Sequence, residues 1–178
     1  MTQLISGQQL ADFVLGYEHE AFRLESRERY NEAEEAEPVR QFLAGQPDYA
    51  WNEQWAAMMR RRTALGQRMA RVRIVAEPHS DYTRFGIDLA RINVTAGEDI
   101  RYLPRAKAMG LDLPSHDFCL IDSRRVAILH FGDDDVLLGA EIATGPTVVA
   151  RHSGWRDMAW RAAVPLSAVP GGTGRQAP

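Results

Sequence analysis

The sequence predicts a mixed α/β (α+β) fold, in which helices pack on a mixed sheet of roughly five strands. Three observations predict it: a strand–helix–strand order over residues 71–104, three strand patterns with tight connections from there to residue 143, and mainly helical patterns in residues 1–69. We therefore expect a helical segment at residues 1–69 packed on a mixed core at residues 70–166, and a flexible tail at residues 167–178.

The first segment is predicted to hold three helices and one short strand. Ser6 and Gln9 have capping-box spacing at the start of a helix that runs to about Gly16. The stretch AFRLES, residues 21–26, alternates apolar and charged side chains and favours a strand. Residues 31–47 begin acidic and end in Gly45 and Pro47, as a helix does. Residues 48–67 predict a third helix with an apolar stripe made of Trp51, Trp55, Met58, Met59 and Leu65.

The core begins with a strand, a crossover helix and a second strand. VRIVAE, residues 72–77, is the first strand, Ser80 is a good N-cap, and Gly97 is a plausible helix stop before the strand DIRYLP, residues 99–104. Such a unit nearly always has parallel strands. A short helical turn at residues 106–109 follows, and then the strands 117–122, 125–131 and 136–143 are close enough to form an antiparallel meander. Pro146 opens a closing helix.

The composition restricts the class of protein. With 178 residues, 45% hydrophobic and 25% charged, the chain suits one globular domain. A net charge of −3 does not favour direct nucleic-acid binding. The chain shows neither a secretory signal nor an apolar stretch of membrane-spanning length, so we expect a cytoplasmic protein with no membrane contact. The single cysteine, Cys119, lies in an apolar run and is expected to be a buried, inert thiol.

The first candidate binding site is the loop VAEPHSDYTRF, residues 75–85. It follows the carboxyl end of a parallel strand, where sheets of this kind bind ligands. Glu77, His79, Tyr82 and Arg84 are its candidate ligand-binding side chains, together with Arg73 on the strand before it, and the amides that open the helix would attract an anion. The alternative is a structural loop in which Ser80 caps the helix and the charged groups are solvated.

The second candidate group is His152, Trp155 and Arg156 on the closing helix, with Asp117 at a strand end. Arginine beside tryptophan suits a carboxylate, a phosphate or an aromatic partner. A core histidine and an aspartate that ends a strand are the plainer interpretations. We expect both groups to meet in one recess. No phosphate-binding glycine loop, zinc-ligand spacing or serine-nucleophile motif occurs, so we expect no metal, no cofactor and no catalytic residue.

The order of several segments resembles a known family. FRLESRERY, a tryptophan-bearing helix, VRIVAEPHSDYTRF, AGEDIRYLPR, LPSHDFCLID and RHSGWRDMAWRAAVPL together resemble an uncharacterised actinobacterial family found beside Scr-type helix-turn-helix regulators, in toxin–antitoxin-like pairs. The resemblance covers residues 22–166. It implies a non-catalytic regulatory or interaction protein that partners such a regulator. Together with the candidate site, it suggests sensing of a small anionic ligand.

A weaker similarity concerns residues 72–163, which look like one half of a phospholipase D-like fold. His116 matches the histidine of that motif, but Phe118 replaces the lysine and Ser123 the aspartate, with Asp122 one position early. A phosphoryl transition state would then lack a local stabilising charge. The alternative function is a small phosphodiesterase or nuclease that acts as a toxin, in which Glu77, His79, Asp117, Asp122 and His152 converge. By analogy, such halves pair as homodimers.

Charge patterning predicts one further feature. A basic stretch at residues 60–73 and an acidic stretch at residues 18–37 carry opposite charges. The plain expectation is that they neutralise each other within the fold, and the alternative is contact with a partner.

Overall fold

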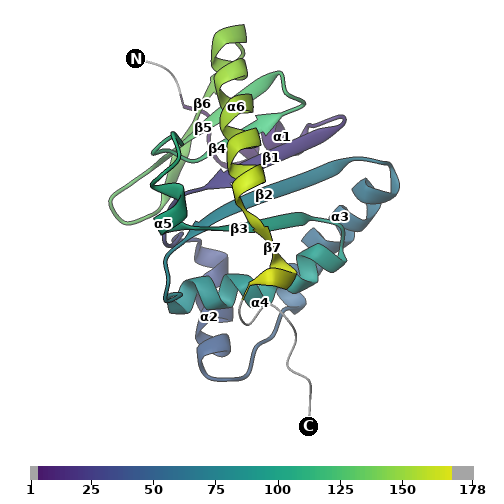
Figure 1. The fold of residues 1–178 in the computed structure, drawn as a ribbon. Helices are drawn as coiled ribbons and strands as arrows, with labels where there is room; N and C mark the ends of the chain where they lie inside the picture. The colour runs from purple at the N-terminus through teal and green to yellow at the C-terminus, as the bar shows by residue number, and fades with distance from the viewer. Residues whose placement is uncertain (1–3, 170–178) are drawn as a thin grey trace.

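A computed structural model describes residues 4–169 and contains one mixed sheet in the order β6-β5-β4-β1-β2-β3-β7 (Figure 1). β1, β2 and β3 are parallel neighbours, β4 is antiparallel to β1, and the remaining pairs are antiparallel. The strands are β1 (Glu20–Glu25), β2 (Arg68–Val75), β3 (Asp99–Pro104), β4 (Phe118–Ile121), β5 (Arg125–Phe131), β6 (Leu137–Ala143) and β7 (Val164–Pro165).

The predicted fold class is confirmed, and so are the parallel unit and the antiparallel meander. The sheet has seven strands where roughly five were expected. The two-residue β7 is too short to give a sequence pattern, and its pairing with Arg101 and Tyr102 of β3 decides its conformation. The strand of the N-terminal segment, β1, lies between β4 and β2 at the centre of the sheet. Residues 1–69 thus contribute to the core itself.

Every predicted helical stretch contains a helix, although the helices within residues 31–47 and 48–67 are shorter than predicted. The helices are α1 (Gly7–Leu15), α2 (Ala36–Leu43), α3 (Glu53–Ala64), α4 (Asp81–Thr95), α5 (Arg105–Ala108) and α6 (Pro146–Ala162), with short 3-10 turns η1 (Ala33–Glu35), η2 (Ala50–Asn52) and η3 (Leu166–Ala168). Ser80 caps α4, because its hydroxyl accepts a hydrogen bond from the Thr83 amide at 3.2 Å. Ser6 precedes α1 as predicted but makes no capping bond with its side chain.

The two faces of the sheet are covered by different helices. α5 and α6 pack on the face that carries Phe22, Leu24, Val72 and Phe118. On the opposite face, α1 packs against β6 of the meander, α3 packs against β2 and α4, and α4 packs over β2 and β3 with Ile87 among its buried residues. Figure 1 shows α6 crossing the sheet while α2, α3 and α4 gather together. Both faces of β1 and β2 are therefore covered.

Some details of the sequence interpretation change. In the predicted apolar stripe of α3, Met59 is buried, but Leu65 is 78% exposed and Trp51 is 37% exposed. Leu65 lies at the C-cap, beyond the last residue that packs on the sheet. Residues 170–178 of the expected tail lie outside the described residues, and Val169 just before them is buried. Among residues 4–169, no helix has the length and apolar character needed to cross a membrane.

Candidate functional site

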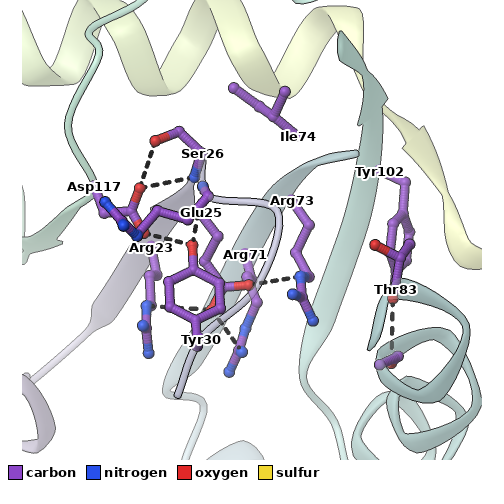
Figure 2. Close-up of polar contacts among 12 residues, drawn as sticks. Arg23, Glu25, Ser26, Tyr30, Arg71, Arg73, Ile74, Thr83, Tyr102 and Asp117 are labelled. Carbon is purple, nitrogen blue, oxygen red and sulfur yellow. Dashed lines mark hydrogen bonds and ion pairs between the residues drawn. The ribbon is translucent and has the colours of Figure 1, made fainter. Parts of the chain in front are cut away.

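Strand alternation places four charged side chains on one face of the central strands. Arg23 and Glu25 of β1 pair in register with Arg71 and Arg73 of β2. Because successive side chains of a strand point to opposite faces, all four point away from the apolar face under α6. Figure 2 shows the three arginines extending in one direction and Ile74 in the other (Figure 2). Charged groups of two neighbouring strands thus face the helical layer of α3 and α4.

Glu25 is the centre of an ion-pair network in this layer. Its Oε1 lies 2.9 Å from Nη1 of Arg71 and 3.2 Å from Nε of Arg23, and its Oε2 lies 2.9 Å from Nε of Arg73. Arg71 also contacts the buried Glu98 at 2.7 Å. Burial alone would raise the pKa of Glu25, but the attraction of the three guanidinium groups outweighs it and lowers the pKa to about 2.

A cavity of about 790 Å³ opens beside this network, between the sheet and the layer of α3 and α4. We call it the arginine cavity. Its floor is formed by the network residues of β1 and β2 with Tyr102 of β3, and its walls come from η1, η2, α3 and α4. The lining includes Arg23, Glu25, Arg71, Arg73, Tyr102, Tyr30, Glu32, Glu34, Glu35, Trp51, Asn52, Trp55, Arg61, Tyr82, Phe85, Gly86 and Asn93.

Two tyrosines hold the guanidinium of Arg73 in place. Its central carbon lies 5.7 Å from the ring centre of Tyr30 and 5.6 Å from that of Tyr82. Cation–π contacts of this kind are stronger when the groups are removed from water. Gly86 of α4 makes room for the same group, because a Cβ atom there would lie 2.5 Å from Nη1 of Arg73. Tyr82 is in turn fixed by donating a 2.6 Å hydrogen bond to Glu35.

The network leaves donors without protein partners. Within residues 4–169, the terminal nitrogens of Arg23 and Arg73 make no hydrogen bond, since their contacts to Glu25 run through Nε. The Arg23 Nε and the Glu25 Oε2 are buried near opposite charges, yet neither has the geometry of a hydrogen bond. Three guanidinium groups stand against the carboxylates of Glu25 and Glu98, so the floor carries a surplus positive charge. Such a floor suits an anionic ligand.

The predicted loop lies at the carboxyl edge of the parallel strands, but only some of its side chains reach the arginine cavity. Tyr82 faces the arginine cavity, as does Arg73 before the loop. Glu77 and Arg84 are exposed, and Arg84 pairs with Asp81 one turn away. His79 contacts the Ala76 carbonyl through Nδ1 at 2.9 Å and does not line the cavity. For these last three residues the plainer interpretation, a solvated helix start, describes the geometry.

Asp117 lies at the same edge of the sheet but outside the arginine cavity. It is buried and accepts hydrogen bonds from the Ser26 amide at 2.8 Å, the Ser26 hydroxyl at 2.6 Å and the Tyr30 hydroxyl. These bonds tie the chain that leaves β1 to the start of β4. Burial raises the pKa of Tyr30, so its hydroxyl stays protonated and donates. Asp117 therefore supports a wall residue of the cavity without reaching the cavity itself.

His152 and Trp155 lie on the opposite face of the sheet. α6 packs on the apolar face, and the His152 ring contacts those of Phe118 and Trp155, with centres 4.8 Å apart in each case. Nδ1 of His152 lies 2.8 Å from the Val148 carbonyl and so carries a proton, and Nε2 lies 3.3 Å from Nε2 of His116. Burial lowers the pKa of both histidines. The sheet therefore separates His152 and Trp155 from the arginine cavity, and the two candidate groups do not meet in one recess as expected.

Arg156 and the aspartate of the phospholipase D-like comparison lie at the other end of β1. Arg156 donates to Glu20 and to the Ser123 hydroxyl, both at 2.9 Å. Asp122 accepts hydrogen bonds from the backbone amides of residues 18–20, and these bonds lower its pKa against the opposing effect of burial. Asp122 and His116 therefore do not form a shared site. Among residues 4–169, no three His, Cys, Asp or Glu side chains are grouped to hold a metal ion.

Comparison with known proteins adds one finding. The family described as "Domain of unknown function (DUF6879)" matches residues 8–168. The chain belongs to this family. No match was found among curated proteins. The family match spans every strand and helix that forms the arginine cavity, and it assigns neither an activity nor a partner.

Sequence reasoning missed most of this family member's cavity, although a signal was present. The alternation that predicts β1 places Arg23 and Glu25 on one face, and the same alternation in β2 places Arg71 and Arg73 on one face. A sheet covered by helices on both sides buries whichever face these charges occupy. The wall residues Trp51, Trp55 and Glu35 gave no comparable signal, because only tertiary packing brings α3 and η1 over the sheet.

Proposed function

We propose that this protein binds a small anionic molecule in the arginine cavity, and that it acts as the regulatory partner of a helix-turn-helix transcriptional regulator, not as an enzyme. The observation that carries the first part is the pair of guanidinium groups, Arg23 and Arg73, whose terminal nitrogens have no protein partner among residues 4–169. Arginine presents donors in a fixed fork that matches carboxylate and phosphate oxygens.

Burial supports the same proposal. The side chain of Arg73 is 11% exposed, and burial, which alone would lower its pKa, is outweighed by the attraction of Glu25, so the pKa is raised and the group stays charged. A buried charge without full compensation is costly. An anion that occupies the cavity offsets this cost, and its binding free energy then appears as added stability of the folded state.

The regulator is proposed as the partner because residues 22–166 resemble a family found beside Scr-type regulators. The preference for a non-catalytic role has a different basis, which is the lining of the cavity. The lining residues include arginines, glutamates and tyrosines but no histidine, and the two paired histidines lie across the sheet. Burial raises the pKa of the buried Tyr30 and of the half-buried Tyr82, so neither hydroxyl supplies a base near neutral pH.

The test is thermal unfolding and calorimetric titration of the full chain with phosphate, sulfate, citrate and nucleoside phosphates. We expect at least one anion to stabilise the protein, and Arg73→Gln to weaken its binding at least tenfold. Arg84→Gln is the matched control, because Arg84 is exposed and paired outside the cavity. If no anion binds, or if both variants behave alike, the proposal fails.

The partner is tested separately. A Scr-type helix-turn-helix regulator, expressed with the tagged chain, should co-purify with it, and a failure to co-purify would overturn the partnership. Hydrolysis of a generic phosphodiester by a clean preparation, abolished by His116→Ala, would contradict the non-catalytic role and favour the phospholipase D-like alternative.

A further inference from the structure

The arginine cavity differs in charge between its floor and its mouth. The floor holds Arg23 and Arg73 with free terminal nitrogens. At the mouth, Glu32 and Glu34 of the η1 region are exposed and line the same cavity. A simple anion would satisfy the floor alone. A ligand that fills the cavity must therefore present an anionic group at one end and hydrogen-bond donors at the other.

Two tryptophans that line the same cavity are free to stack. Trp51 is 37% exposed at the mouth, and Trp55 is half-buried with its Nε1 donating to Glu98 at 3.2 Å, which fixes the ring. Within residues 4–169, neither indole ring packs against another aromatic ring or a guanidinium group, whereas Tyr30 and Tyr82 are both engaged by Arg73. Unoccupied indole faces in a cavity wall suit a planar ring, and stacking on such rings binds nucleobases.

The size excludes a bare inorganic anion as the natural fit. The cavity volume of about 790 Å³ lies within the range typical for sites of drug-sized ligands and cofactors. The space needs a molecule with an anionic end, a planar ring, and N–H or O–H donors.

From this combination, and resting on the proposed anion-binding function, we propose that the ligand is a nucleoside monophosphate. Its phosphate binds Arg23 and Arg73, its base stacks on Trp51 or Trp55, and its ribose hydroxyls or base amino groups donate to Glu32 and Glu34. A triphosphate is disfavoured, because the added negative charge would extend toward the carboxylates at the mouth.

The experiment is calorimetric titration of the full chain with AMP and GMP, with their nucleosides, with ribose 5-phosphate and with ATP. We expect at least one monophosphate to bind at least tenfold more tightly than its nucleoside, than ribose 5-phosphate and than the triphosphate. Trp51→Leu should weaken monophosphate binding several-fold and leave ribose 5-phosphate binding unchanged, while Arg73→Gln should weaken both. The exposed Leu65→Ala, also near α3 but outside the cavity, is the control.

The outcomes separate this inference from the proposed function. If ribose 5-phosphate or inorganic phosphate binds as tightly as every nucleotide, the proposed anion-binding function is supported and the proposal of a nucleotide ligand is overturned. The same holds if an aromatic amino acid or an aromatic carboxylate binds while nucleotides do not. If none of these anions binds, the proposed function fails together with the inference.

Discussion

Gly86 and Arg73 occupy neighbouring positions that depend on each other: a Cβ atom on the glycine would lie 2.5 Å from Nη1 of the arginine. A glycine inside a helix costs about 1 kcal/mol relative to alanine. This glycine lies where the guanidinium group of Arg73 meets α4. It makes the helix less stable than alanine would, and it leaves room for the cation in the cavity.

Gly86→Ala should therefore separate binding from folding. The alanine stabilises the helix by about 1 kcal/mol, and the displacement of Nη1 of Arg73 acts in the opposite direction, so we expect a small net change in the free energy of unfolding while anion affinity falls at least tenfold. Calorimetry and denaturant unfolding measure the two effects. Gly154→Ala in α6 is the matched control, because nothing lies within 4 Å of its Cβ position. It should leave affinity unchanged, and equal affinity in both variants would contradict the role assigned to Arg73.

Glu25 should be required for folding more than for binding. Glu25→Gln leaves three buried guanidinium groups without their central carboxylate, and breaking a buried pair costs about 3–5 kcal/mol. Denaturant unfolding at pH 7 measures the loss. Glu37→Gln, which removes an exposed pair with Arg40, should leave stability nearly unchanged. Comparable losses in the two variants would show that the network is not what holds β1 to β2.

The same carboxylate predicts a pH dependence. Unfolded Glu25 takes up a proton near its ordinary pKa of 4.5, whereas in the fold its pKa is about 2. The stabilisation is therefore complete above about pH 4.5 and is lost as the pH falls toward 2. The stability difference between the wild type and Glu25→Gln should be constant from pH 5 to 7 and shrink below pH 4.5. If the stability difference between the two proteins grew as the pH fell, it would contradict a lowered pKa for Glu25.

His116 and His152 should make the protein less stable in mild acid. Their pKa values are lowered by burial below the ordinary 6.5, so the unfolded chain binds these protons more readily. Stability is full above about pH 6.5 and falls as the pH drops below it. The double variant His116→Asn, His152→Asn should lose less stability between pH 7 and 5 than the wild type. An equal loss of stability in the double variant and in the wild type would contradict this role for the two histidines.

Cys119 should resist thiol reagents in the native protein. It is 2% exposed, and burial raises its pKa to about 11, so almost no thiolate forms near neutral pH. As Cys119 is the single cysteine of the chain, labelling with a chromogenic disulfide should be slow in buffer and complete in denaturant. Rapid labelling of the native protein would mean that the packing of β4 against β1 and β5 opens readily.

Local signals were sufficient for most elements. Ser80 at the start of α4, Pro146 at the start of α6 and the alternation in β1 each act over a few residues, so the sequence alone predicts where these elements lie. The exposed Leu65 and the short β7 were not predictable, because their environment depends on where α3 and α6 end against the sheet.

The candidate site was predictable only in part. The loop before α4 lies at the expected edge of the sheet, and Arg73 and Tyr82 reach the cavity. His152 and Trp155 do not, because α6 packs on the face of β4 that carries Phe118, across the sheet from Arg73.

The amino-acid sequence by itself determined the order of strands and helices, the fold class and the alternation that gives β1 and β2 one apolar and one charged face. These follow from contacts between near neighbours in the chain. Only the tertiary structure decided that helices cover the charged face and enclose a cavity there, because the packing of α3 and α4 on β1 and β2 joins residues far apart in sequence. Which groups share that cavity depends on the side of the sheet each helix covers.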